Sequence, residues 1–294
     1  MRNLSVPIIE TKNLTYNYLL SSNFKNTAIK NINVKIYPED IVAIIGCTGS
    51  GKSSFIQHLN GLLKPSYGKV FFNGEDIWSN NFNIKNLRFK VGVVFQYPEH
   101  QLFEDTISKD IAFGPKNMGL CKEEIRKRVE VAANFVGLNK KILNESPFDV
   151  SGGEKRKAAI AGIIAMDPDV IVLDEPTTGL DPLSRDMLLF DIFNYHKKRR
   201  NTVIFTSHNM EEVAQIANKV LVLHHGNAIM FGKTIDIFSK ANKLTEIGLS
   251  IPEITNVIME LKSIGYKSLP DCVLTVNEAT KSILNLFNLL NLKQ

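Results

Sequence analysis

The sequence contains few cysteines and no long hydrophobic run, and each absence excludes a class of protein. Its three cysteines, Cys47, Cys121 and Cys272, lie far apart and form no CxxC pair. This spacing argues against a disulfide framework or a zinc site and predicts a reducing compartment. No apolar stretch approaches the roughly 18 residues that cross a bilayer, and the N-terminal MRNLSVPIIETKN lacks the apolar core of a signal peptide. We therefore expect a cytosolic chain that is free to dock on a membrane protein.

Composition and net charge are those of an ordinary globular protein and exclude few classes of function. The chain has 294 residues, which suggests one large domain or a domain with an appendage. With 44% hydrophobic and 22% charged residues, it can bury a sizeable core. A net charge of +5 suits acidic headgroups, nucleotides or nucleic acid equally, so it does not choose among these partners.

Alternating strand and helix patterns predict an α/β fold. The apolar runs IVAII, VGVVF, VIVLD, TVIFTSH and KVLVLHH are typical of buried parallel strands. Helical patterns follow several of them, as in KSSFIQHLNGLL and LSRDMLLFDIFNYHKK. Alternation of this kind predicts a mostly parallel sheet with helices on both faces.

Other segments flank or interrupt this alternation. The N-terminal runs IIETKNLTYNY and AIKNINVKIYPED are β-rich, and KVFFNGEDI predicts a strand that enters an Asn-Gly turn. CKEEIRKRVEVAANFVGL and EKRKAAIAGIIAM predict an inserted pair of helices, and two or three amphipathic helices follow from about residue 240. The predicted units are residues 1–238, with the helical insertion at about 97–165, and a small helical extension at 239–294.

The segment GCTGSGKS at 46–53 fits the phosphate-loop pattern G-x-x-x-x-G-K-[ST], and it has the required strand before it and helix after it. Its glycines let several backbone N–H groups point at one anion, and the helix N-terminus adds its positive dipole end. Lys52 would reach the β- and γ-phosphates of ATP, and the Ser53 hydroxyl is a hard oxygen ligand suited to Mg²⁺. The predicted nucleotide-binding residues here are Gly46, Cys47, Thr48, Gly49, Ser50, Gly51, Lys52, Ser53 and Ser54.

Two acids end the strand in DVIVLDEP at 169–176. At the carboxyl end of a parallel strand they would face the ligand crevice. Asp174 fits the residue that holds Mg²⁺ through its water shell, and Glu175 fits the base that polarises the attacking water. With the phosphate loop, these acids predict an ATPase, without saying what hydrolysis drives.

A second anion cradle opens the segment VSGGEKRK at 150–157, about twenty residues before the acidic strand. It resembles the signature motif of ATP-binding cassette (ABC) proteins. That resemblance implies an ABC-type P-loop NTPase fold, with a RecA-like parallel core, an N-terminal antiparallel β subdomain and an inserted helical subdomain. It also implies a head-to-tail pair of cassettes, in which the signature of one closes over the ATP bound by the other. Val150 and Glu154 depart from the commoner leucine and glutamine, and Glu154 adds a carboxylate near the nucleotide.

The same resemblance assigns further residues. Tyr18 would stack on adenine, with Tyr16 as the competing choice. Gln96 would sense Mg²⁺ and the γ-phosphate, and His208 would contact the γ-phosphate. The residues that it implies for catalysis are Gln96, Glu175 and His208; for Mg²⁺, Ser53, Gln96 and Asp174; and for the partner's ATP, Ser151, Gly152, Gly153, Glu154 and Asp181.

Two hypotheses explain what ATP hydrolysis drives: transport across a membrane, or the action of a soluble cassette protein on DNA or ribosomes. Soluble cassettes that act on ribosomes usually carry two cassettes in one chain, and those that act on DNA insert a long coiled coil before the signature. This sequence has one cassette, no sustained heptads and no basic-aromatic stripe. The sequence therefore favours the motor subunit of a membrane transporter, and we expect no nucleic-acid partner.

Within transporters, QYPEHQLFEDTISKDIAFGP, the segment around VSGGEKRK and the C-terminal extension resemble energy-coupling factor ATPases, the second of two paired ATPases in particular. That group powers uptake of vitamins and transition-metal ions. The resemblance implies a heterodimer with another such ATPase, a transmembrane coupling protein and a substrate-binding membrane protein, at the cytoplasmic face of the cell membrane. An ABC importer with a soluble binding protein is the alternative.

Two local hypotheses remain open. Cys47, inside the phosphate loop, is either a reactive thiolate in an electropositive setting or a buried inert thiol. The segment Tyr97–Phe103 is expected to form a surface that contacts the membrane partner, and Glu99 is taken as part of its exposed face. Alternatively, Leu102 and Phe103 pack beneath the helical subdomain.

Overall fold

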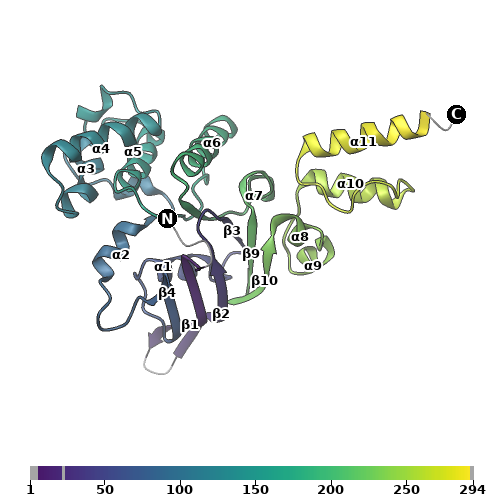
Figure 1. The fold of residues 1–294 in the computed structure, drawn as a ribbon, viewed down its shortest axis with the longest axis horizontal. Coiled ribbons are helices and arrows are strands. Elements are labelled where there is room, and N and C mark those ends of the chain that lie inside the picture. The colour runs from purple at the N-terminus through teal and green to yellow at the C-terminus, as the bar shows by residue number, and fades with distance from the viewer. Residues whose placement is uncertain (1–5, 22–23, 292–294) are drawn as a thin grey trace.

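A six-stranded sheet forms the centre of the molecule in the computed structural model, which describes residues 6–21 and 24–291 (Figure 1). Its order is β10-β9-β3-β8-β7-β6, and all neighbours are parallel except the β9–β10 hairpin. The predicted mostly parallel sheet is thus confirmed, while β10 was not expected from the sequence. The strands are β3 (Ile41–Ile45), β6 (Val91–Val94), β7 (Val170–Leu173), β8 (Thr202–Thr206), β9 (Lys219–His224) and β10 (Asn227–Lys233).

Both faces of this sheet are covered, which explains why its central strands are apolar throughout. Successive residues of β3 alternate between two cores: Ala43 belongs to one and Val42 to the other. The core around Ala43 contains side chains from α6 (Pro182–Arg199), α7 (Met210–Ile216), α8 (Thr234–Phe238) and α9 (Ala241–Glu246). The core around Val42 contains side chains from α1 (Lys52–Leu59) and α2 (Ile84–Lys90).

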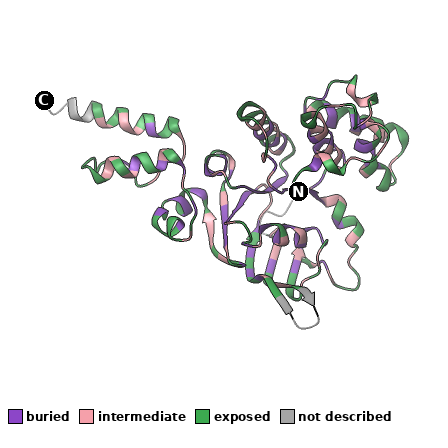
Figure 2. Ribbon diagram, turned by 180° about the vertical axis from the view of Figure 1, so that it is seen from behind, coloured by how far each residue is buried: buried purple, intermediate pink, exposed green. Residues whose placement is uncertain are grey.

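An antiparallel sheet of order β2-β1-β4-β5 packs on the Val42 core. The expected Asn-Gly turn is present, because Asn73 and Gly74 both have positive φ, 49° and 85°, as the tight turn between β4 and β5 requires. Figure 2 shows buried residues on the strands of both sheets. The strands are β1 (Ile9–Ser21), β2 (Phe24–Ile36), β4 (Tyr67–Phe72) and β5 (Glu75–Asp76).

A group of helices lies between β6 and β7 in the chain, as predicted for the insertion (Figure 1). One of them, α3, was not foreseen, because Gly114 and Pro115 near its end read as helix breakers. The Thr106 side chain caps it, and Gly114 lets it approach Met166 closely, since a Cβ there would lie 2.5 Å from the Met166 Cγ. The elements are η1 (Pro98–Gln101), α3 (Ile107–Asn117), α4 (Lys122–Phe135), η2 (Ile142–Asn144) and α5 (Gly152–Ile164).

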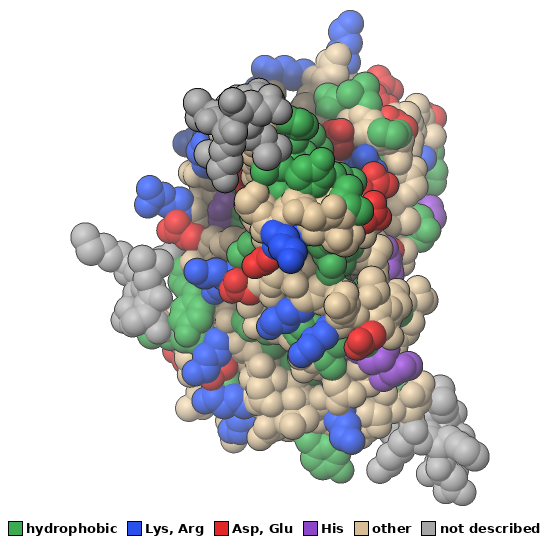
Figure 3. Space-filling model, turned by 90° about the vertical axis from the view of Figure 1, so that its right-hand side faces the viewer, with side chains coloured by type: hydrophobic (Ala, Val, Ile, Leu, Met, Phe, Trp, Pro, Cys, Tyr) green, Lys and Arg blue, Asp and Glu red, His purple; other side chains and the backbone are tan. Residues whose placement is uncertain are grey.

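The C-terminal helices α10 (Glu253–Ser263) and α11 (Val276–Asn291) project from the body (Figure 1). A separate small core lies there, formed by Ile258, Leu269, Val273 and Ala279. Leu244 of α9, by contrast, packs in the core around Ala43. The predicted boundary at 238/239 stays a prediction. Figure 3 shows hydrophobic side chains gathered in the upper part of this end of the molecule. No helix in the described part of the chain is long and apolar enough to cross a membrane.

Candidate functional site

The phosphate loop connects β3 to α1, and its glycines are required by close backbone packing. A Cβ on Gly46 would lie 2.3 Å from the Leu223 carbonyl oxygen, and one on Gly51 would lie 2.5 Å from that of Ala28. Gly51 also has a φ of 99°, which L side chains rarely adopt. The spacing of the motif therefore matches the steric needs of the loop.

Lys52 is buried at the start of α1, and its ammonium is tied to the loop. It donates to the carbonyl oxygens of Gly46 at 2.8 Å and Cys47 at 3.3 Å. Burial lowers the pKa of Lys52, while the charges of Glu175 and Asp174 oppose that shift. The lysine is thus a pre-positioned cation with protein carbonyls that a phosphate can replace.

A cavity of about 590 Å³ opens over this loop, and it brings together residues that are far apart in the sequence. Of the residues predicted for this site, Gly46, Cys47, Ser50 and the buried Asp174 are not among its lining residues. The predicted residues that line it are Tyr18, Thr48, Gly49, Gly51, Lys52, Ser53, Ser54, Gln96, Glu175 and His208.

The two tyrosines of β1 have different surroundings. Tyr18 lines the cavity, and its hydroxyl lies 3.3 Å from the Ser54 Oγ. Tyr16 packs partly buried against the core and edge-on against His58. This geometry favours Tyr18 over Tyr16 as a stacking partner for a base, although its role stays a prediction.

Thr206, at the end of β8, fixes both acids that follow β7. Its hydroxyl donates to the Asp174 Oδ1 at 2.7 Å, and its oxygen accepts the Glu175 backbone N–H at 2.8 Å. Glu175 has a φ of 48°, a strained conformation for a residue with a Cβ. The neighbouring strand thus orients the Asp174 carboxylate and holds the backbone of Glu175.

The Glu175 carboxylate is the meeting point of the three residues predicted for catalysis. Gln96 Nε2 donates to its Oε2 at 3.1 Å, and His208 Nε2 lies 2.6 Å from its Oε1. Thr178 also donates to Oε2, at 3.2 Å. Residues from the ends of β6, β7 and β8 therefore converge at one edge of the sheet, as expected for parallel strands.

The signature segment lies away from this edge: Ser151, Gly152, Gly153, Glu154 and Asp181 do not line the cavity. A Cβ on either glycine would meet no described atom within 4 Å, so packing inside this chain does not require glycine there. The Asp181 carboxylate caps α6 by accepting from the Ser184 N–H at 3.0 Å.

Glu154 forms a capping box with Ser151 at the start of α5. Its Oε2 accepts from the Ser151 hydroxyl at 2.8 Å and from the Ser151 backbone N–H at 2.9 Å. These hydrogen bonds, side chain first, lower the pKa of Glu154. The signature serine thus carries a bound carboxylate, a contact that the S-x-x-E spacing would have predicted.

The segment after Gln96 differs in one respect from the expected exposed surface. The side chains of Tyr97 and Phe103 are 45% and 63% exposed to solvent. Leu102 is partly buried and packs against the core around Ala43. The Glu99 side chain, however, is only 16% exposed and pairs with Arg156, which is 7% exposed. The assignment of Glu99 to the exposed face was therefore wrong, because the turn η1 directs it inward.

Cys47 lies against the turn that precedes the C-terminal helices. Its Sγ is 3.5 Å from the Ile247 carbonyl oxygen and 3.8 Å from that of Gly248. The thiol is partly buried. Its reactivity stays a prediction.

Some residues of the site were not predicted from the sequence. Thr206 orients the acids, and Asn26 and Thr27 of β2 line the cavity. The β-rich run was recognised, but no local signal shows that Asn26 and Thr27 face the phosphate loop, because the pairing of β1 with β2 decides this.

Comparisons with known proteins agree over most of the chain. The sequence pattern of the ABC transporter family matches residues 29–178. The energy-coupling factor transporter ATP-binding protein EcfA2 of Clostridium tetani is 46% identical over 281 residues, which cover 95% of this chain and 97% of that protein. EcfA2 of Caldanaerobacter subterraneus subsp. tengcongensis is 48% identical and covers 94% of this chain and 96% of its own length. The solved structure of cbiO1 from Clostridium perfringens, part of the ABC transporter complex cbiONQ, has a TM-score of 0.72 at 35% identity and covers 87% of this chain and 99% of its own.

Proposed function

Since the chain belongs to the ABC transporter family and, within it, to the energy-coupling factor transporter ATP-binding proteins, we propose that it powers uptake of a vitamin or a transition-metal ion through membrane partners. It is the ATPase subunit of such a transporter. The observation that carries the residue assignment is the Glu175 carboxylate, contacted by Gln96 and His208 at the edge of the phosphate-loop cavity.

ATP binding would use charge and backbone donors that are already in position. Lys52 would exchange its carbonyl partners for the β- and γ-phosphates, a stronger charge-assisted contact. The loop N–H groups and the N-terminus of α1 would surround the same anion. Tyr18, 38% exposed at the rim of the cavity, would stack on the adenine ring.

The residues present fit Mg²⁺ bound together with a nucleotide. The described part of the chain contains no cluster of three or more His, Cys, Asp or Glu residues that could hold a metal by itself. Ser53, Gln96 and Asp174 offer oxygen donors, and Mg²⁺ is typically bound by a few protein oxygens plus substrate phosphates and water. When bound, Mg²⁺ neutralises charge on the phosphates.

Glu175 would accept a proton from the attacking water. Gln96 and His208 would keep its carboxylate directed at the cavity and would lie near the γ-phosphate, so that positioning and electrostatic stabilisation supply most of the rate. Thr206 would act as a positioning residue, since it binds both Asp174 and Glu175.

The closed state would need a second cassette, a related ATPase in a heterodimer. In support, the glycines of the signature are not required by packing inside this chain, and the N-terminus of α5 already accepts the negative charge of the Glu154 carboxylate that sits there. Ser151 would contact ATP held by the partner, and Asp181 would lie near that interface.

The surface for the membrane partner would be a groove lined by α2, the end of η1, α3 and α5. It has a volume of about 300 Å³ and includes Phe103, Phe113 and Asp110 in its lining. Asp110 is 8% exposed, and its Oδ2 has no hydrogen-bond partner among the described residues. An apolar segment with one cationic side chain would suit this groove. We expect such a segment on the cytoplasmic side of a transmembrane coupling protein, which would hold the chain at the cytoplasmic face of the cell membrane.

The test is Glu175→Gln in the purified transporter complex. We expect ATP binding to be retained and turnover to fall by about 10²–10⁴-fold, the usual contribution of a positioned general base. Exposed Glu246→Gln on α9 serves as the control and should keep wild-type turnover. Wild-type ATP hydrolysis in Glu175→Gln would refute Glu175 as the base.

An importer that uses a soluble binding protein is the alternative assembly. Mass spectrometry of the intact, detergent-extracted complex distinguishes the two. A second ATPase, a coupling protein and a small substrate-binding membrane protein are expected, and a complex without the last of these would favour the alternative.

A further inference from the structure

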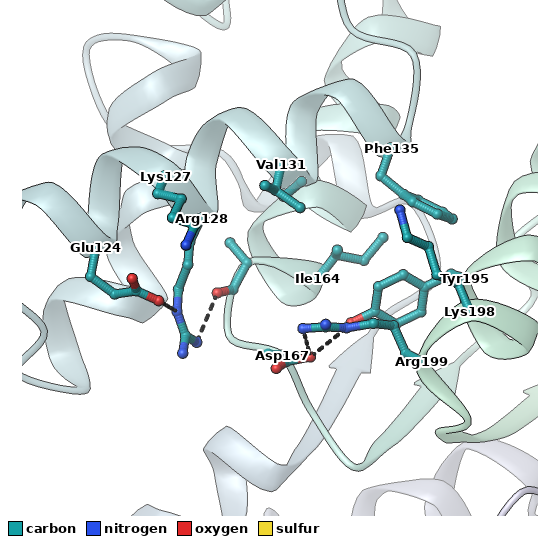
Figure 4. A pocket seen from close by; sticks show the side chains of 12 residues that line it. Glu124, Lys127, Arg128, Val131, Phe135, Ile164, Asp167, Tyr195, Lys198 and Arg199 are labelled. Carbon is teal, nitrogen blue, oxygen red and sulfur yellow. Dashed lines mark hydrogen bonds and ion pairs between the residues drawn. The ribbon is translucent and has the colours of Figure 1, made fainter.

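A separate pocket lies between α4, the loop after α5 and α6 (Figure 4). Its volume is about 260 Å³, and it shares no lining residue with the cavity over the phosphate loop. Val131 and Phe135 of α4 and Ile164 of α5 give it an apolar wall. The proposed ATPase mechanism uses none of these residues.

The two acids in this pocket are already neutralised by two arginines. Arg128 Nε lies 2.9 Å from Glu124 Oε1, and Arg199 Nη2 lies 2.5 Å from Asp167 Oδ1. Arg128 also donates to the Met166 carbonyl oxygen at 3.2 Å. These ion pairs neutralise the two carboxylates of the pocket and hold both guanidinium groups in place.

Two further cations of the pocket have no such partner. Lys127 and Lys198 line it, and neither makes a hydrogen bond or a close ion pair with a residue that the structure describes, although the charge of Lys127 also acts on Glu124. Figure 4 shows Lys198 close to Tyr195 and Phe135, whereas Lys127 lies near Arg128. Lys198 follows Tyr195 by one helical turn, so both side chains project from the same face of α6.

Tyr195 supplies a donor that is buried and unused. The residue is 4% exposed, and the Arg199 guanidinium lies beside its hydroxyl, but a guanidinium only donates, so the hydroxyl proton has no acceptor in the described structure. Its ring packs edge-on against Phe135, with ring centroids 5.0 Å apart. Burial raises the pKa of Tyr195 to about 12, so the hydroxyl keeps its proton at neutral pH. A buried hydroxyl proton without an acceptor destabilises the folded chain, and an acceptor brought by a ligand would remove that penalty.

We propose that this pocket binds a small organic carboxylate, whose carboxylate group is held by Lys198 and the Tyr195 hydroxyl and whose flat apolar body lies against Phe135 and Val131. Lys127 adds attraction from the other end of the pocket. A volume of about 260 Å³ is below the roughly 300–1,000 Å³ typical of sites for drug-sized ligands, so the ligand is expected to have one or two rings. Because α4 and α6 both line the pocket, the ligand would connect the inserted helices to the core.

The probe is 1-naphthoate, titrated calorimetrically into the full-length chain, with the neutral 1-naphthylmethanol as its matched control. We expect one site per chain and at least about tenfold tighter binding of the carboxylate, which corresponds to 1.4 kcal/mol. No saturable binding of 1-naphthoate up to about 5 mM, the range of very weak complexes, would overturn the proposal. Equal affinity of the two probes would also overturn it.

Variants test the two residues that contact the carboxylate. Tyr195→Phe should weaken 1-naphthoate binding about fivefold while changing the melting temperature little, because the hydroxyl proton has no acceptor to lose. Lys198→Gln should weaken it about tenfold, whereas Lys197→Gln, on an exposed neighbour outside the pocket, should not. Unchanged affinity in Tyr195→Phe, or equal losses in Lys197→Gln and Lys198→Gln, would contradict the proposed site.

Discussion

Arg156 connects three segments that carry predicted site residues, and its removal should loosen all of them. Its Nε and Nη2 each donate to Glu99 of the segment after Gln96, both at 3.1 Å. Its Nη1 donates to the carbonyl oxygens of Pro176 at 3.2 Å and Thr178 at 2.9 Å. Because Arg156 belongs to the helix that begins at the signature, one guanidinium joins the signature, the Gln96 loop and the loop after Glu175.

The size of the effect follows from burial. Only 7% of the Arg156 side chain and 16% of the Glu99 side chain are exposed, so solvent screens the pair weakly. Removing one partner of a buried ion pair costs about 3–5 kcal/mol. At about 2–4 °C per kcal/mol for domains of this approximate size, Arg156→Ala should lower the melting temperature by roughly 6–20 °C. Glu99→Ala should cost about 1.5–3 kcal/mol, because the guanidinium keeps its two carbonyl acceptors.

A double-mutant cycle in urea isolates the pair. We expect Glu99→Ala and Arg156→Ala to show a coupling free energy of at least about 1.5 kcal/mol. The matched control is the exposed pair Arg126–Glu130, with exposures of 83% and 48%, which should couple by no more than about 0.5 kcal/mol. If the two cycles gave equal coupling, the assignment of Arg156 as a structural junction would be refuted.

Three other predictions concern charge and reactivity. Burial opposes ionisation of Glu99, but the hydrogen bond and charge of Arg156 outweigh it and lower the pKa of Glu99. The difference in unfolding free energy between wild type and Glu99→Gln should therefore be constant at about pH 6–8. It should shrink below about pH 4, because Glu99 then takes up a proton. A flat difference down to acid unfolding would contradict this. Glu154→Gln keeps the capping box but removes the negative charge beside Ser151. Repulsion between that charge and a phosphate about 4 Å away in water is worth about 1 kcal/mol, so sedimentation should show about fivefold tighter ATP-dependent pairing of cassettes. Unchanged pairing would count against the proposed role of Ser151. Alkylation of Cys47 should block ATP binding and be slowed by ATP, as peptide mass spectrometry can measure; equal labelling with and without ATP would leave Cys47 as an inert thiol packed against Ile247.

Local patterns predicted much of the fold and of the nucleotide site. The phosphate loop could be recognised directly, because its glycines, lysine and serine all lie within eight consecutive residues. The parallel strands were recognisable because a strand buried on both faces must be apolar throughout. Since such strands end at one edge of the sheet, Gln96, Glu175 and His208 could be placed together without knowledge of a single distance.

The sequence by itself therefore determined the chemistry of the nucleotide site and the order of the elements, which depend on residue type and short-range spacing. Only the tertiary structure decided which way individual charges face. Glu99 points inward because η1 brings it to Arg156, 57 positions along the chain. In the same way, the Tyr195 pocket exists only because α4 and α6, far apart in sequence, enclose a hydroxyl and a lysine that no local pattern marks. Contacts between distant segments depend on how the elements pack, and packing is not encoded in any short stretch of residues.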